Sequence, residues 1–274
     1  MSFSADVKES LSQMTHFDKA VLEAELIGYC LSGNIMKVGN FFEFVTENQF
    51  NIEHFYKILF HLGIEYEPEV RGKCYIAQIP GNIVEKMMQN RQVVQGEMRK
   101  NLVKGAFLGA GSVNNPEKNY HLEFLVGCEE YADFLRDVCG ELGVQFKKIR
   151  VNDKFQLYLK ESEEISRFLA LIGASKAVLK FEEIRVMKEM KNQVNRKVNC
   201  ETANLTKTID AALKQIEDIL LIQKRQKFEE LPQELREVAI LRLENPDLSL
   251  KDLSELMSSP IRKVGGESSF EENS

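Results

Sequence analysis

The feature that most constrains the fold of this 274-residue chain is an internal repeat with an offset of about 80 residues. The stretches AELIGYCLSGN (24–34) and KGAFLGAGSVN (104–114) both favour helix, and each is closed by a glycine, Gly33 or Gly111. We expect each glycine to lie just after its helix, where the left-handed conformation favours glycine. A period this long does not suit a solenoid and fits a duplicated α/β unit.

Both copies of the repeat continue with the same order of patterns. A strand-like run follows each glycine, and then comes an amphipathic helix that ends on Gly63 or Gly143. Hairpin patterns come next, with turns near Gly72 and Asn152, and another helix closes each copy. Each copy therefore reads αββαββα. The predicted fold class is α+β, with two such units forming a pseudo-symmetric pair.

The pattern changes beyond Ala174, where charged, helix-favouring segments take over. The stretch 228–274 contains successive short helical patterns, one opened by Pro232 and one by Ser249 as N-cap, as in a helix-turn-helix domain. Its leucines are expected in the core: Leu248, Leu250, Leu253 and Leu256. We expect four segments, namely the first half (1–92), the second half (93–176), a helical linker with a basic segment (177–227) and the helix-turn-helix domain (228–274).

Composition argues against a membrane-spanning, secreted, metal-binding or catalytic protein. With 43% hydrophobic residues the chain can bury a core, and no apolar run approaches the roughly 20 residues of a membrane span. The N-terminus lacks the basic-then-apolar pattern of a signal peptide, which favours a cytoplasmic protein. The five cysteines and four histidines are scattered, so we expect reduced thiols, no metal site and no cofactor. Adjacent carboxylates such as Glu163 and Glu164 point different ways on a helix, and we expect no catalytic residue.

The glycine-rich stretch 104–113 admits three interpretations. A dinucleotide loop follows a strand and precedes a helix, whereas this stretch ends a helix and precedes a strand, so that order is wrong. A core helix with small residues four apart lets another helix backbone approach closely. Thirdly, the placement of such a stretch in both copies resembles the LAGLIDADG motif of homing endonucleases, whose paired helices join two halves. The interface residues are then Gly28, Ser32, Gly33, Gly105, Gly109, Ala110 and Gly111.

The resemblance to homing endonucleases stops at their chemistry. In that family the acidic residue just before the last glycine holds the catalytic divalent metal, and here Ser32 and Ala110 stand at those positions. A hydroxyl and a methyl group cannot replace carboxylates as ligands of Mg²⁺. The expectation is a helix interface without a nuclease site.

A second resemblance covers the whole chain. The strings KGAFLGAGSVNNPEKNYHLEF, RFLALIGAS, NRKVNCETANLTKTIDAA and LPQELREVAILRLENPDLSLKDLSELM are similar to the WhiA family of bacterial regulators. This resemblance implies a degenerate LAGLIDADG-like domain, a C-terminal helix-turn-helix and sequence-specific binding of double-stranded DNA at cell-division or sporulation genes. It implies no nuclease activity and a location at the nucleoid. Another DNA-bound transcription factor is a further partner that it admits.

Charge is uneven along the chain, which carries a net charge of −6. Residues 180–227 hold eleven basic and seven acidic side chains, so a DNA-binding segment is compatible with the acidic total. Cations pair with phosphate and amides pair with adenine or phosphate, which makes candidates of Arg196, Lys197, Asn199, Asn204 and Lys207. The competing interpretation is a solvated helix with an ordinary cap around Asn199 and Thr202. In the last domain the candidates are Ser249, Lys251, Ser258, Ser259, Arg262 and Lys263.

The end of the chain departs from the family pattern. After Lys263 the family continues with a short basic helix that can enter the major groove, whereas this chain reads VGGESSFEENS. A single base inserted into the gene after the codon of Lys263 would shift the reading frame and replace the basic helix by this acidic sequence. We therefore expect the tail to be a frameshift product. Two other functions stay open: a protein-interaction adaptor that uses the degenerate domain and, more distantly, an active endonuclease.

Overall fold

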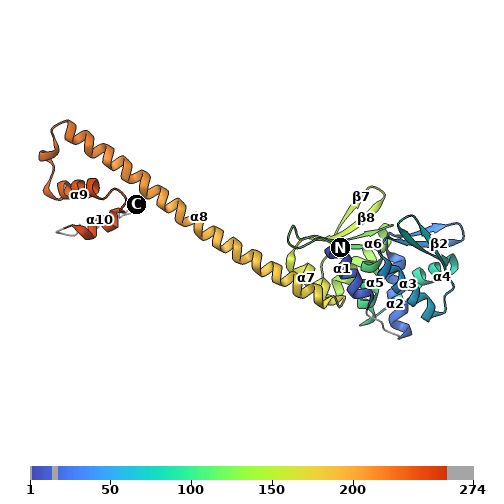
Figure 1. Ribbon diagram of the computed structural model, residues 1–274. Coiled ribbons are helices and arrows are strands. Elements are labelled where there is room, and N and C mark those ends of the chain that lie inside the picture. The colour runs from blue at the N-terminus through green and yellow to red at the C-terminus, as the bar shows by residue number, and fades with distance from the viewer. Residues whose placement is uncertain (1, 14–17, 258–274) are drawn as a thin grey trace, which may run out of the picture. The chain divides into compact units, whose positions relative to one another are not determined.

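The computed structural model describes residues 2–13 and 18–257 (Figure 1). The chain divides into two compact units, residues 1–189 and residues 190–274. Within the described ranges, no helix is both long enough and apolar enough to cross a membrane.

The first half of the N-terminal unit contains four helices and a four-stranded sheet. The sheet is antiparallel, with the strand order β1-β2-β4-β3. The elements are α1 (Phe3–Ser12), α2 (Lys19–Leu31), β1 (Ile35–Val38), β2 (Phe41–Thr46), α3 (Gln49–Leu62), β3 (Glu67–Arg71), β4 (Cys74–Pro80) and α4 (Gly81–Gln89).

The second half repeats this topology, with the strand order β5-β6-β8-β7. The register repeats as well, because the pair Glu43↔Gln78 recurs 80 residues later as Glu123↔Tyr158. The αββαββα duplication is therefore confirmed. The elements are a 3₁₀ turn (Asn90–Val93), α5 (Met98–Ala110), β5 (Gly111–Val113), β6 (Leu122–Val126), α6 (Glu129–Glu141), β7 (Lys147–Val151), β8 (Lys154–Leu159) and α7 (Ser162–Leu171).

Left-handed residues end helices and turn hairpins at equivalent places in the two halves. Gly63 (φ 66°) follows α3 and Gly143 (φ 85°) follows α6. The two hairpins turn at Gly72 (φ 63°) and Asn152 (φ 54°). Positive φ suits glycine and, at lower cost, asparagine, so the sequence marks these turns clearly.

The expectation of left-handed glycines at 33 and 111 is wrong. Gly111 has φ −75° and ψ 151°, an extended conformation, and Gly33 is not among the glycines with positive φ. Space is what restricts Gly33 to glycine, because a Cβ atom there would lie 2.8 Å from the carbonyl oxygen of Leu125. Its N–H donates to the same oxygen at 2.8 Å, which ties the end of α2 to β6 of the other half.

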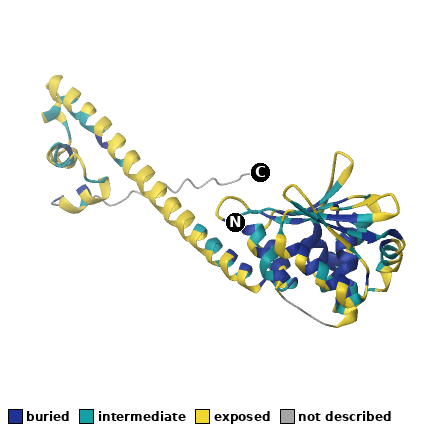
Figure 2. Cartoon of the chain, turned by 45° about the vertical axis from the view of Figure 1, so that its right-hand side comes forward, coloured by how far each residue is buried: buried dark blue, intermediate teal, exposed yellow. Residues whose placement is uncertain are grey.

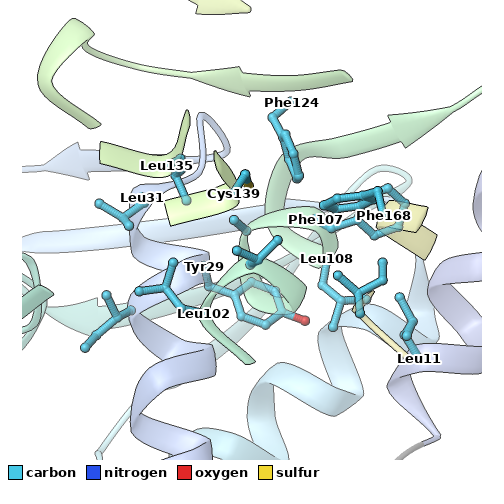
Figure 3. Packing of buried hydrophobic residues seen from close by; sticks show 14 of the residues in the cluster. Leu11, Tyr29, Leu31, Leu102, Phe107, Leu108, Phe124, Leu135, Cys139 and Phe168 are labelled. Atoms are coloured by element: carbon cyan, nitrogen blue, oxygen red, sulfur yellow. The ribbon is translucent and has the colours of Figure 1, made fainter. Parts of the chain in front are cut away.

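The core lies between the helices and the two sheets (Figure 2). In the first half the rings of Tyr29, Phe44 and Phe55 pack together, with centroid distances from 4.6 to 5.2 Å. In the second half, Phe107, Phe124 and Phe168 form the matching cluster (Figure 3). Each cluster joins a helix of the interface to its own sheet, so burial of the rings fixes helix and sheet together.

The C-terminal unit is built on the end of one long helix. Its elements are α8 (Ser175–Lys224), which begins in the N-terminal unit, a 3₁₀ turn (Phe228–Glu230), α9 (Gln233–Glu244) and α10 (Leu250–Leu256). Ala212 of α8, Ala239 of α9 and Leu253 of α10 are buried and form a small core. The expectation that Leu250 and Leu256 are core residues is wrong, since they are 55% and 54% exposed.

Candidate nucleic-acid interface and the junction of the halves

The two halves meet where α2 and α5 cross with their backbones in contact. A Cβ atom on Gly28 would lie 2.0 Å from the carbonyl oxygen of Leu102. A Cβ atom on Gly105 would lie 2.0 Å from the carbonyl oxygen of Glu25. Both glycines therefore serve close approach between helices, since any side chain at either position would push the helices apart.

The positions that would carry metal-binding carboxylates lie at the ends of these helices. Ser32 caps the C-terminus of α2, and Ala110 is the last residue of α5. The Oγ of Ser32 is buried without a hydrogen-bond partner in the part of the chain that the structure describes. Beside it, Lys154 donates from Nζ to the Gly33 carbonyl oxygen at 3.4 Å. A hydroxyl, a methyl and an ammonium group form a poor donor set for Mg²⁺.

Potential metal-ligating side chains are dispersed in the described part of the chain. Among residues 2–13 and 18–257, no three His, Cys, Asp or Glu side chains are close enough to hold a metal ion. The donor set therefore does not fit the divalent cation of the endonucleases.

The sequence reasoning missed a buried ionic cluster at the junction. Glu25 of α2 binds His54 of α3 (Oε1 to Nε2, 2.7 Å) and Lys104 of α5 (both carboxylate oxygens to Nζ, 3.2 Å). All three side chains are buried. Burial raises the pKa of Glu25, but the hydrogen bond from His54 and the charge of Lys104 outweigh it and leave the pKa below its usual value. The signal in the sequence was a charge next to each apolar run that contains a packing glycine, Glu25 before LIGYCL and Lys104 before GAFLGA.

A second polar network ties α3 to the end of α5. The hydroxyl of Tyr29 donates to Asn51 Oδ1 at 2.6 Å, and Asn51 Nδ2 donates to the carbonyl oxygen of Leu108 at 2.7 Å. The same carbonyl accepts from Lys8 Nζ of α1 at 3.2 Å. Burial raises the pKa of Tyr29 well above its usual value, with a further contribution from the Glu25 charge. These contacts are structural, because they satisfy buried groups that face each other.

The five candidate residues of the basic segment lie on one exposed side of α8. Arg196 and Lys207 are eleven residues apart, about three turns, and lie almost above one another. Lys197 and Asn204 are seven residues apart, about two turns, and form a neighbouring row. Asn199 lies on the other flank, so that the five span an arc of about 160°. All five side chains are exposed.

The alternative of a helix cap around Asn199 and Thr202 is wrong. α8 continues without a break from Ser175 to Lys224, so Asn199 cannot cap a new helix. Thr206 Oγ1 donates to the Thr202 carbonyl oxygen at 3.0 Å within the helix. The amides and cations are thus presented on one continuous helix, and no loop interrupts them.

The helix-turn-helix begins with α9, and one buried arginine fixes it to α8. Arg242 of α9 donates from Nε to Gln215 of α8 at 3.0 Å and from Nη1 to the carbonyl oxygen of Leu248 at 2.5 Å. Ser249 caps α10 and forms a capping box with Asp252. Sequence reasoning missed Arg242, since its spacing resembles that of an ordinary surface residue.

Of the DNA-binding candidates in the last domain, some lie within the described residues, which end at residue 257, and the others lie beyond them. Ser249 Oγ accepts from the Asp252 N–H at 3.2 Å and is occupied as a cap. Lys251 is exposed on the first turn of α10. Ser258, Ser259, Arg262, Lys263 and the tail that we interpret as a frameshift product lie outside the described residues.

Comparison with protein families assigns both parts of the chain. Residues 99–191 match the WhiA LAGLIDADG-like domain, and residues 194–270 match the WhiA C-terminal HTH domain. A probable cell division protein WhiA of Clostridium acetobutylicum is 37% identical over 300 residues, covering 97% of this chain and 94% of that protein. A relative of the same description in Clostridium tetani is 37% identical over 297 residues, covering 97% of this chain and 93% of that protein.

Solved structures agree with these matches. The crystal structure of full-length DUF199/WhiA from Thermatoga maritima matches 93% of this chain and 91% of its own, with a TM-score of 0.65 and 25% identity. The N-terminal LAGLIDADG domain of DUF199/WhiA shares the fold, with a TM-score of 0.55 over 63% of this chain and 92% of its own, at 22% identity. The resemblance inferred from the sequence is confirmed, and the chain belongs to the WhiA family.

Proposed function

We propose that this chain is a sequence-specific regulator that binds double-stranded DNA and acts on bacterial cell division, with sporulation genes among its targets. The observation that carries the proposal is the helix-turn-helix unit anchored on α8, whose residues match the WhiA HTH domain. Its relatives are named probable cell division proteins. In this proposal the protein works at the nucleoid in the cytoplasm, and another DNA-bound transcription factor is its second partner.

The exposed side of α8 supplies phosphate contacts in this proposal. Arg196 and Lys207 lie in line on one side of the helix, and neither side chain forms an ion pair with a carboxylate of residues 2–13 or 18–257. Lysine and arginine on phosphate fix the position of a protein on the duplex, while base contacts give specificity. Lys251 at the start of α10 is a further contact in the second unit.

The proposal includes the absence of nuclease activity. It rests on the donor set at the ends of α2 and α5, where Ser32 and Ala110 stand in place of carboxylates. Incubation of duplex DNA with the full chain and Mg²⁺ is expected to leave the duplex intact. Cleavage that depends on the metal would contradict this part.

The α8 contacts are tested by salt-dependent binding. Each phosphate contact contributes about −0.9 to the slope of log K against log salt. For the double variant Arg196→Ala/Lys207→Ala we expect weaker binding to all duplexes and a slope shallower by about 2, about 1 per contact. Lys191→Ala is the matched control, since Lys191 lies on the other side of the same helix. Equal slopes for the native chain and the double variant would remove α8 from the interface.

A second candidate function is a protein-interaction adaptor. It is favoured by the first sheet, where Met36, Val38 and Phe41 are 52%, 49% and 42% exposed next to Glu43, whose buried carboxylate is paired with Arg71. A face of this composition suits protein better than phosphate. If the full chain gives no shift with any duplex even at low salt, the adaptor is the better account.

A further inference from the structure

The middle of α8 carries an apolar stripe that no described residue covers. Its members are 42% to 60% exposed, although side chains of these types are usually buried. All of them lie in the C-terminal unit. The stripe consists of Met190, Val194, Val198, Leu205 and Ile209.

The spacing places these residues on one side of the helix. Successive members are four, four, seven and four residues apart, and Glu201 stands in the longer gap. At about 100° per residue the five side chains occupy an arc of about 100°, so the stripe winds slowly around the helix from Met190 to Ile209. Over 20 residues it is about 30 Å long. Contiguous apolar surface of this kind marks an interaction site, unlike single exposed side chains.

The stripe is symmetric about its own midpoint. Reversing the segment 190–209 exchanges Met190 with Ile209 and Val194 with Leu205. A second copy of the same helix, laid antiparallel, therefore brings apolar side chain against apolar side chain towards both ends of the stripe. Reversal also pairs Val198 with Glu201, the charged residue in the longer gap.

Charge at the centre of the stripe fits the same arrangement. Lys197 lies beside Val198, so antiparallel reversal places it within about one residue of Glu201 in the second copy. The two-fold symmetry of the dimer repeats this ion pair, so that Lys197 of each copy lies near Glu201 of the other. In a parallel pair Glu201 would instead face its own copy, which is unfavourable. An interface of this type is isologous and closes at two subunits.

We propose that the chain forms an antiparallel homodimer through this stripe on α8. Two helices of 20 residues bury less than the roughly 800 Å² per partner of a standard interface, so the dimer forms in the micromolar range. The side that carries Arg196 and Lys207 points away from the second copy, which leaves it free. Arg196 and Lys207 therefore stay available for DNA in the dimer, whereas Lys197 is shared with the ion pair to Glu201.

Sedimentation of the full chain across the micromolar range tests the dimer. We expect a concentration-dependent monomer–dimer equilibrium in the native chain. Leu205→Glu is expected to weaken dimerisation at least about tenfold, because two added charges would face apolar side chains. Asn192→Glu adds the same charge on the opposite side of the helix and should dimerise like the native chain. A native chain that stays monomeric, or equal dimerisation by both variants, overturns the proposal.

Disulfide trapping tests the orientation. Val194→Cys and Leu205→Cys chains, each also carrying Cys200→Ser, are mixed and oxidised, since this reversal pair lies on nearly the same line of the helix. The antiparallel arrangement predicts a mixed disulfide between the two different chains in preference to disulfides between identical chains. A preference for identical pairs would show a parallel dimer and overturn the proposed orientation. Circular dichroism of each variant confirms that α8 remains helical.

Discussion

At the residue scale, the positions where α2 and α5 cross restrict the amino acid most strongly, because only glycine fits there. A Cβ atom on Gly28 would lie 2.0 Å from a backbone oxygen, which cannot move without separating the halves. We expect Gly28→Ala to lower the free energy of unfolding by about 3 kcal/mol or more. Gly127→Ala is the control, because a Cβ atom there meets nothing within 4 Å. Denaturant unfolding measures both, and a cost at Gly28 no larger than at Gly127 would contradict the crossing.

The buried Glu25 makes stability depend on pH. Its folded-state pKa lies below the ordinary 4.5, so its contribution is present above about pH 4.5 and is lost as the pH falls through the folded value. At pH 7 we expect Glu25→Gln to cost about 3 to 5 kcal/mol, since Lys104 and His54 lose their partner. The difference should shrink below pH 4.5. Unfolding curves of both proteins between pH 7 and pH 3 check this, and a constant difference would refute the assignment.

The residues that sequence reasoning missed share a cause. Glu25 and Lys104 are 79 residues apart in the chain, and only the crossing of α2 and α5 brings them together. Pairing across a duplicated fold leaves no local pattern to read. The conformation of Gly111 was misread for a related reason, because a glycine required by space and one required by positive φ look identical in sequence.

At the element scale, α8 runs for 50 residues because nothing in it stops a helix. It contains no glycine or proline, and it ends where Gln226 adopts φ 57°. The sequence allowed helical segments to be predicted here, and the αββαββα order, the hairpin turns and the capping box at Ser249 were all readable from local signals. The continuity of the helix through Asn199 could not be predicted from local signals, because asparagine occurs both as a helix cap and on the solvated face of a helix.

A proline substitution distinguishes these two structures. If Asn199 capped a new helix, residue 200 would be its first position, where proline is tolerated. In a continuous helix Cys200→Pro removes a hydrogen bond and clashes with the preceding turn, at a cost of about 3 kcal/mol. We expect circular dichroism to show lost helicity in Cys200→Pro and none in Cys200→Ala. Unchanged helicity in the proline variant would restore the cap.

At the scale of the whole molecule, the chain combines a nuclease-like duplicated fold with a helix-turn-helix unit. The first has kept the glycine crossing of the two halves and carries Ser32 and Ala110 where metal ligands would stand. The second is assembled on α8 by Arg242 and a small core. The fold class and the family could be inferred from the sequence, whereas the burial of charges at the junction required the structure.

Our central proposal is that the regulator selects DNA sequences and leaves them uncut. Because the residues after Lys263 lack the basic helix of the family pattern, the most direct measurement uses a chain in which they are replaced by the basic sequence of the neighbouring reading frame. That chain is incubated with a pool of random duplexes at physiological salt and Mg²⁺, and the bound fraction is sequenced and its length is examined. The account predicts enrichment of one sequence motif in duplexes of unchanged length. A bound fraction with the composition of the starting pool, or one that contains cut strands, would contradict it.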